Sequence, residues 1–139
     1  MSLVFVDTGA WIALLNSRER LHLRARETYA SCSNQGVRLA TSSDVLDETT
    51  TRLRYDVGLK AALAFRDAVE SAQQKRLLRV LWVDANVHRQ AWALLERHRD
   101  IELSFTDATS AAIARALKMK TVFGFDGDFR SLGFELIPG

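Results

Sequence analysis

The chain is poor in cysteine, which cross-links small proteins, and in proline, which often marks linkers between domains. Its 139 residues include one cysteine, Cys32, and one proline, Pro138. A lone cysteine excludes an intrachain disulfide and a zinc site made only of cysteines from one chain. Since the proline lies at the carboxyl end and no linker or low-complexity tract precedes it, we expect a single domain over residues 1–139.

Long apolar runs and a strong charge of either sign are missing as well. No apolar stretch approaches the ~18 residues of a membrane span, and the start of the chain has no basic segment of the kind that opens a signal peptide. We therefore expect no membrane contact and a cytoplasmic location. The net charge of +2 permits nucleic-acid binding without arguing for it.

Short apolar runs alternate with segments of helical periodicity. Strands are predicted at residues 3–6, 37–41, 78–83, 121–125 and 134–137, and helices at 8–16, 22–34, 43–55, 59–75, 86–99 and 104–118. This alternation implies the α/β class: a three-layer α/β/α sandwich with a central, mostly parallel sheet of four to five strands. Ligands of such folds bind beyond the carboxyl ends of the strands.

Acidic residues occur at that edge of the predicted sheet. Asp7 directly follows the first strand, and Asp126 follows the fourth. Asp107 lies at the start of the helix before the fourth strand, and Glu48 lies in the helix at 43–55. Because Asp7 comes after four apolar residues, its carboxylate is partly desolvated and needs a metal ion, a cationic side chain or hydrogen-bond donors.

Two of these acids also have a structural interpretation within a helix. Asp107 fits a capping box with Ser104, which would tie down a helix start. Glu48 can pair with Arg52 one helical turn later on a solvated face. Both alternatives stay open at the level of the sequence.

The remaining acids sit where turns and helix caps are expected. Asp126 and Asp128 lie in a segment, Phe125–Asp128, that is typical of a turn. Asp84 follows the third strand and is expected to cap the helix after it. We keep Asp84 in that structural role.

Taken together, the carboxylates require a counter-charge. Two unit charges about 5 Å apart repel by roughly 3 kcal/mol at an effective dielectric near 20, so three or four cannot stay ionised side by side. A divalent cation relieves this repulsion. Oxygen ligands without histidine or cysteine favour Mg²⁺ or Mn²⁺ over Zn²⁺.

Four segments of the chain carry a resemblance to a known family. They are Val4–Thr8, Asp44–Glu48, Leu103–Ala108 and Phe125–Phe129. In this order, over nearly the whole chain, they resemble the PIN domain, and more closely the toxin ribonucleases of the VapC type. Leu103–Ala108 is the most specific of them, because it matches the family's third acid together with the Ser and Thr positions before it.

The resemblance implies a PIN-like fold and an Mg²⁺- or Mn²⁺-dependent ribonuclease that hydrolyses RNA phosphodiester bonds. By the same resemblance the catalytic residues are Asp7, Glu48, Asp107 and Asp126, which also bind metal with Asp128 as an auxiliary ligand. Thr8 and Thr106 are candidates to orient these carboxylates. The implied partners are RNA, a small protein antitoxin and a second copy of the chain in a homodimer. The alternative is a non-catalytic PIN-like module that binds RNA or a protein.

Two positions depart from the family's pattern. Gly124 stands where the family often has Thr or Ser, so a polar contact near the metal is expected to be lost. The β-branched run Thr49–Thr51 weakens the helix that carries Glu48, so tertiary packing must hold that helix in place.

Basic and aromatic residues are the remaining candidates for contact with RNA. Phosphate binding is expected from some members of a basic set: Arg18, Arg20, Arg24, Arg26, Arg52, Arg54 and Lys60. For Trp11, Trp82 and Trp92 we favour packing in the core over stacking on bases.

Overall fold

Residues 2–139 are described by a computed structural model. Within them, one sheet contains β1 (Leu3–Val6), β2 (Arg38–Ser42), β3 (Leu78–Leu81), β4 (Thr121–Phe123) and β5 (Glu135–Ile137). The strand order is β3-β2-β1-β4-β5, and every neighbouring pair is parallel. The predicted parallel sheet is therefore confirmed, with its fifth strand at one edge.

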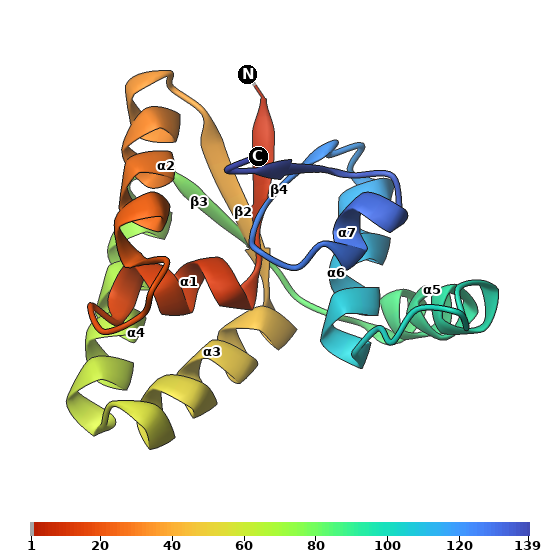
Figure 1. Cartoon of the computed structure of the whole chain (residues 1–139), viewed down its shortest axis with the longest axis horizontal. Coiled ribbons are helices and arrows are strands. Elements are labelled where there is room, and N and C mark those ends of the chain that lie inside the picture. The colour runs from red at the N-terminus through yellow and green to blue at the C-terminus, as the bar shows by residue number, and fades with distance from the viewer. Residues whose placement is uncertain (1) are drawn as a thin grey trace.

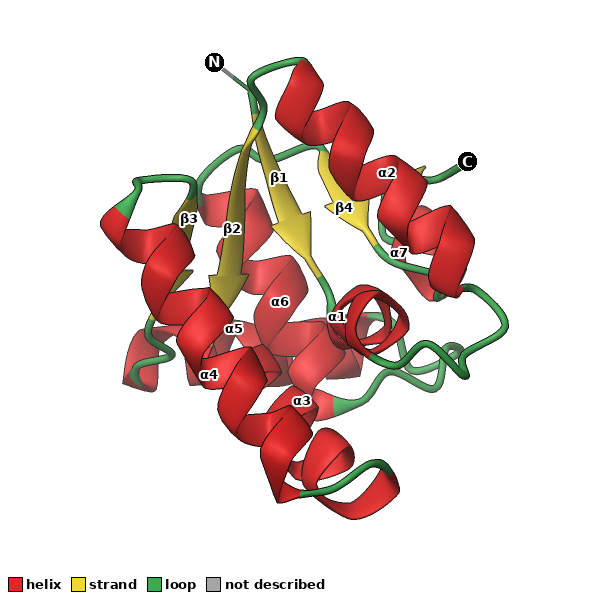
Figure 2. Cartoon of the chain, turned by 90° about the vertical axis from the view of Figure 1, so that its left-hand side faces the viewer, coloured by secondary structure: helices red, strands yellow, loops and turns green. Residues whose placement is uncertain are grey.

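Helices cover both faces of this sheet (Figures 1 and 2). They are α1 (Thr8–Leu15), α2 (His22–Asn34), α3 (Ser43–Asp56), α4 (Leu59–Gln74), α5 (Ala85–Arg97), α6 (Phe105–Ala116) and α7 (Asp128–Ser131). Figure 1 shows α1, α2 and α4 on one side of the strands and α5, α6 and α7 on the other. This is the predicted three-layer sandwich. Among residues 2–139, no helix combines the length and apolarity that crossing a membrane requires.

Strand β1 lies at the centre of the sheet and is buried on both faces. Val4, Phe5 and Val6 are at most 5% exposed, as expected for a parallel strand with helices on each side. The arrowheads of β1, β2 and β4 point toward the same end of the molecule in Figure 2, where α1 and α3 lie. Residues that follow these strands are thereby gathered at one edge.

A hydrogen-bonded link fixes α1 beside the end of β1. The indole Nε1 of Trp11 donates to Thr41 Oγ1 at 3.3 Å, and that hydroxyl donates to the carbonyl oxygen of Val6 at 3.0 Å. Trp11 also packs edge-on against Phe65, with ring centroids 5.4 Å apart. The core position predicted for Trp11 is confirmed, and it holds the start of α1 against the sheet.

The core positions predicted for the other two tryptophans are wrong. Trp82 is 77% exposed and Trp92 is 59% exposed. Trp82 comes directly after β3, an edge strand, where the chain leaves the layered core. Trp92 lies on α5 and contacts Phe105, with ring centroids 5.0 Å apart, at the margin of the helical layer.

Candidate metal centre

Asp7 is held rigidly at the carboxyl end of β1. Its backbone N–H donates to the carbonyl oxygen of Phe123 at 2.9 Å, which continues the pairing of β1 with β4. Its own carbonyl oxygen accepts from the amides of Ala10 and Trp11 in the first turn of α1. The side chain does not cap the helix and is only 6% exposed. The carboxylate is thus desolvated and free for another partner.

Burial and neighbouring negative charges favour the protonated form of this carboxyl. Burial is the largest cause that raises the pKa of Asp7, to about 7, and a backbone amide at the start of α1 opposes it. The charges that raise it further belong to Asp107, Glu48 and Asp126. Burial also raises the pKa of Asp107, and Asp126 and Glu48 act on it in the same direction. Four acids from four separate segments therefore lie within electrostatic reach of one another.

Asp107 combines two roles at the start of α6. Its amide donates to Ser104 Oγ at 3.0 Å, and its Oδ2 accepts from the Ser104 amide at 3.1 Å. The predicted capping box is confirmed. Because the box engages Oδ2, it anchors the carboxyl group and leaves Oδ1 available to a ligand.

Glu48 is half-buried on α3, and the structural alternative for it is absent. Within residues 2–139 no ion pair joins Glu48 to Arg52. The following residue, Thr49, is fully buried. Packing of this side chain against the interior lets α3 continue through the β-branched run Thr49–Thr51, as the sequence required.

Asp126 and Asp128 form the turn that leads into α7. Asp126 Oδ1 accepts from the amide of Asp128 at 2.9 Å, which confirms the turn, and Asp128 then begins a short helix that the sequence did not predict. Among the described residues, the charge of Asp126 acts on Asp7 and Asp107, whereas that of Asp128 acts on neither. The geometry therefore favours Asp126 as the fourth acid.

Asp84 caps α5, as predicted. Its Oδ1 accepts from the amide of Val87 at 2.9 Å. Although Asp84 also follows a strand, its carboxylate is engaged at the helix start and its side chain is exposed.

Buried hydroxyl groups without partners provide a test of whether a metal fits this edge. Within residues 2–139, the side-chain oxygens of Thr8, Thr49 and Ser110 are buried and accept or donate no hydrogen bond. Thr8 follows Asp7, Thr49 follows Glu48, and Ser110 comes one turn after Asp107. Buried hydroxyls are normally satisfied. Of the three, Thr8 directly follows Asp7, so its unpartnered hydroxyl fits a site that holds an ion with its hydration.

In the conformation that the structure has, the carboxylates do not form a complete coordination shell. As the side chains of residues 2–139 stand, no three His, Cys, Asp or Glu groups converge closely enough to hold an ion. Asp7 is fixed by its burial, whereas Glu48 and Asp126 are partly exposed and can rotate. In donor type and charge the residues fit a hard divalent cation, whose binding would draw the flexible acids toward Asp7.

Gly124 lies directly against the Asp7 side chain. A Cβ atom at Gly124 would lie 3.2 Å from Asp7 Cβ and 3.6 Å from Asp7 Oδ2. The first distance is shorter than almost all real Cβ contacts, so a larger residue would displace the carboxylate. Besides lacking the hydroxyl that the family often has at this position, Gly124 makes room for the Asp7 side chain.

A shallow hollow of about 450 Å³ adjoins the acids on the α3 side. Its lining includes Asp44, Glu48, Arg52, His88, Phe105 and Thr106. Asp44 Oδ2 accepts from the hydroxyl of Thr109 at 3.0 Å, which ties α3 to α6. Sequence reasoning missed Asp44, His88 and Phe105 because only the crossing of α3, α5 and α6 brings them together.

The fold and this edge define an α/β protein with an acidic site beyond the carboxyl ends of a parallel sheet. A family model, PIN domain, matches residues 4–135, and the chain belongs to this family. The chain is 38% identical over 132 residues to the 23S rRNA-specific endonuclease VapC20 of Mycobacterium tuberculosis, and the match covers 95% of each protein. It is 28% identical over 126 residues to a VapC ribonuclease of Archaeoglobus fulgidus, covering 89% of this chain and 77% of the relative.

Solved structures give the same result. The crystal structure of M. tuberculosis VapC20, a sarcin-ricin loop cleaving toxin, matches with a TM-score of 0.83 at 38% identity and covers 96% of each chain. VapBC2 from Rickettsia felis, bound to a DNA fragment from its promoter, matches with a TM-score of 0.71 at 15% identity, again over 96% of each chain. The VapC20 match confirms the resemblance drawn from the four sequence segments, and the VapBC2 match shows the shared fold.

The raised pKa of Asp7 predicts a pH-dependent stability of the metal-free protein. The unfolded carboxyl titrates near 3.8 and the folded one near 7. Between these values the folded state holds a proton that the unfolded state has lost, so the free energy of unfolding falls as pH rises, by on the order of 1 kcal/mol per pH unit. Below pH 3.8 the Asp7 carboxyl is protonated in both states and does not affect the free energy of unfolding. Above the folded pKa it is ionised in both states, and the loss of stability caused by its burial no longer changes with pH. Urea unfolding in EDTA across this range measures it.

The Asp7→Asn variant is expected to flatten that profile, because the titrating group is gone. Asp84→Asn is the matched control: asparagine caps helices about as well as aspartate, so the wild-type slope is retained. An Asp7→Asn profile as steep as that of the wild type would contradict the assignment.

The contact between Gly124 and Asp7 predicts a loss of metal affinity in Gly124→Ala. The added methyl group moves the Asp7 carboxylate by a few tenths of an ångström, and we expect Mn²⁺ to bind on the order of tenfold more weakly. Titration calorimetry measures the affinity. Gly9→Ala is the control, since a Cβ there meets nothing within 4 Å. It should stabilise α1 by about 0.5–1 kcal/mol and leave Mn²⁺ binding unchanged. Equal affinities in both variants would refute the role given to Gly124.

Proposed function

We propose that this single PIN-like domain is a ribonuclease that hydrolyses RNA phosphodiester bonds with Mg²⁺ or Mn²⁺, and that it acts in the cytoplasm as the toxin of a toxin–antitoxin pair. The proposal is carried by one observation: three acids from separate segments, Asp107, Glu48 and Asp126, lie within electrostatic reach of the desolvated carboxyl of Asp7. It is supported by 38% identity, over 95% of the chain, to a protein named as an rRNA-specific endonuclease.

Each acid has a distinct part in the proposed site. Asp7 and Asp107 hold the cation, because both are anchored by the backbone around them. Asp126 completes the cluster from the loop after β4, with Asp128 as an auxiliary group. A bound divalent cation supplies positive charge next to the phosphodiester and lowers the pKa of adjacent water. Glu48, on a side chain free to rotate, accepts a hydrogen bond from the attacking water.

The hydroxyls and basic groups around the acids position the substrate. The Thr8 hydroxyl has no partner in the part of the chain that the structure describes, so it is available to donate to a carboxylate or to the water of a bound ion, and Thr106 is proposed in the same role. Of the basic residues expected near the site, Arg52 lines the hollow beside Glu48, where its guanidinium can bind a phosphate in bidentate fashion. Arg24 instead donates to the carbonyl oxygen of Gly139 at 3.3 Å, on a different part of the surface.

Asp107→Asn separates a nuclease from a binding module. Asparagine keeps an acceptor for the Ser104 amide, so the capping box survives while one unit of negative charge is lost. We expect cleavage of single-stranded RNA in Mn²⁺ to fall by about a hundredfold or more, and cleavage by the wild type to stop in EDTA. Gel-resolved time courses measure the rates.

Asp84→Asn, the same chemical change at the cap of α5, should cleave RNA at the wild-type rate. RNA binding by the wild-type protein with no cleavage in either metal would instead favour the non-catalytic module. Cleavage that persists in EDTA would exclude the metal-dependent mechanism.

The proposed protein partner has a place to dock between α1, α2 and α4. A hollow of about 430 Å³ there is mostly apolar. Its lining includes Trp11, Leu14, Tyr29, Phe65, Ala72 and one cation, Arg26. Trp11 and Leu14 of the lining lie on α1, which begins directly after Asp7, so an extended segment seated in this hollow would reach the acids by continuing along α1. We propose this as the antitoxin site; the proposed homodimer is tested by light scattering of the free protein.

Ala68→Glu tests this docking surface. Ala68 is exposed on α4 and lines the apolar hollow, so a buried charge there should weaken binding of the proposed antitoxin by about tenfold or more. RNA cleavage should be unchanged. Ala93→Glu, at an exposed alanine of α5 that lines a different hollow, is the control. Equal binding by both variants, measured by calorimetry, would place the partner elsewhere.

A further inference from the structure

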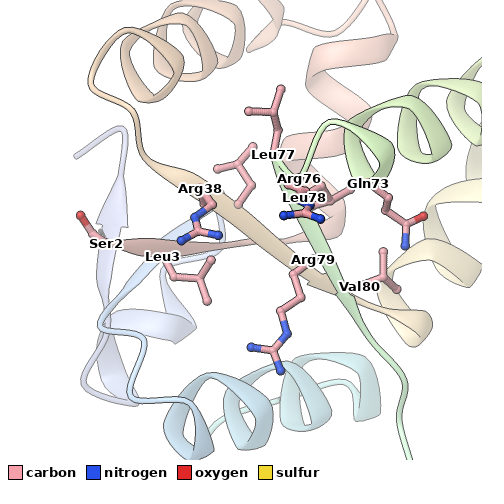
Figure 3. A pocket seen from close by; sticks show the side chains of 10 residues that line it. Ser2, Leu3, Arg38, Gln73, Arg76, Leu77, Leu78, Arg79 and Val80 are labelled. Atoms are coloured by element: carbon pink, nitrogen blue, oxygen red, sulfur yellow. The ribbon is translucent and has the colours of Figure 1, made fainter.

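Another hollow opens at the opposite edge of the sheet from the acids. It has a volume of about 510 Å³ and lies where β1, β2 and β3 begin. Figure 3 shows its lining, in which three arginines, Arg38, Arg76 and Arg79, surround the same space. The remaining lining residues are apolar or uncharged, including Leu3, Leu77 and Gln73.

The register of the sheet directs two of these arginines to the same face. Leu3 pairs with Arg38, and Ala40 pairs with Arg79. Since Arg38 and Ala40 are two positions apart on β2, their side chains share a face, and Arg79 shares it too. Ala40, which lies beside Arg79 in the register, ends at Cβ and leaves space between the two long side chains. In Figure 3 Arg38, Arg79 and Leu3 extend to the same side of the strands.

The third arginine occupies a backbone position that disfavours it. Arg76 follows the end of α4 with φ 58°, in the left-handed region. The amide of Leu77 donates to the carbonyl oxygen of Ala72 at 2.9 Å, which is the closing bond of a helix C-terminal motif that usually has glycine at this place. Arg76 therefore adopts a backbone conformation that favours glycine, and from this position its guanidinium group reaches the hollow.

These three cations have no internal counter-charge. No acidic residue lines the hollow, and in residues 2–139 the ion pair that the structure contains joins Arg66 to Asp67, elsewhere on α4. Guanidinium groups form paired hydrogen bonds with phosphate oxygens. The volume lies within the range of small-molecule sites, and the apolar lining offers a surface for a base or ribose ring.

We propose that this hollow is a nucleotide-binding site, in which the three arginines hold a phosphate group. It is separate from the acid cluster: Asp7 lies four residues beyond Leu3 along β1, about 13 Å at the rise of a strand. The nucleotide is either free or a unit of an RNA strand away from the cut bond. The RNA source rests on the proposed function, and the free source does not.

The test is a titration of the full-length protein in EDTA, where cleavage cannot interfere, followed by amide shifts in two-dimensional NMR. Adenosine 5′-monophosphate is the first probe and a short single-stranded RNA is the second. With the first probe, we expect shifts at residues 38–40 and 76–80 and a Kd about tenfold higher in Arg79→Gln and Arg76→Gly. Arg76→Gly also removes a disfavoured backbone conformation, so its Tm should not fall.

Lys118→Gly is the matched control. Lys118 has φ 57° after α6, and the substitution makes the same change of charge and backbone outside the hollow, so nucleotide affinity should stay at the wild-type value. If RNA shifts the same amides and Arg79→Gln weakens RNA binding, the occupant is a unit of RNA. If only the mononucleotide does so, the occupant is a free nucleotide. Shifts confined to other residues, or equal Kd values in Arg79→Gln, Arg76→Gly and Lys118→Gly, would overturn the proposal.

Discussion

The burial of one carboxyl group, that of Asp7, governs the organisation of this molecule. The strand before Asp7 is the central one, and its backbone stays paired to β4 through the Asp7 amide. The backbone at Asp7 is therefore fixed by the sheet, and the residue is only 6% exposed. Its surroundings raise its pKa to about 7 by burial and by the charges of other acids. Ionising this buried carboxyl beside other negative charges costs free energy, and a bound cation would offset that cost.

The parallel topology is what converts distant acids into neighbours. Carboxyl ends of parallel strands meet at one edge, so Asp7 and Asp126 come near each other although they are 119 positions apart in the sequence. Asp107 and Glu48 are delivered by helices that pack against that edge, since α3 contacts both α1 and α6. The positions of Asp7 and Asp126 could be predicted from where the strands end, whereas Glu48 and Asp107, which lie on helices, were assigned by the family resemblance.

What sequence reasoning could not foresee depends on contacts across elements. From the sequence, Gly124 indicated only the absence of a hydroxyl group. The sequence around it does not show that a Cβ atom at this position would lie 3.2 Å from the Cβ of Asp7. Helix α7 has four residues, too few for a period of 3.6 to emerge. For Trp82 and Trp92, packing in the core was favoured over stacking on bases, but solvent exposure is decided by whether a neighbouring layer covers them. Asp107 was posed as cap or ligand, and its two oxygens allow both.

The mild net charge of +2 conceals a separation of charge along the sheet. Acids collect where the strands end, and at the ends where β2 and β3 start, Arg38 and Arg79 stand on one face with Arg76 beside them. The net charge of the whole chain is small because the charges at the two edges nearly cancel. A polyanion near the protein interacts with the charges closest to it, because the field of an exposed charge is screened beyond a Debye length of about 8–10 Å. For an RNA substrate, repulsion at the acid edge and attraction at the arginine edge would act on different parts of one strand. Under the proposed function, the divalent cation offsets the repulsion at the acid edge alone.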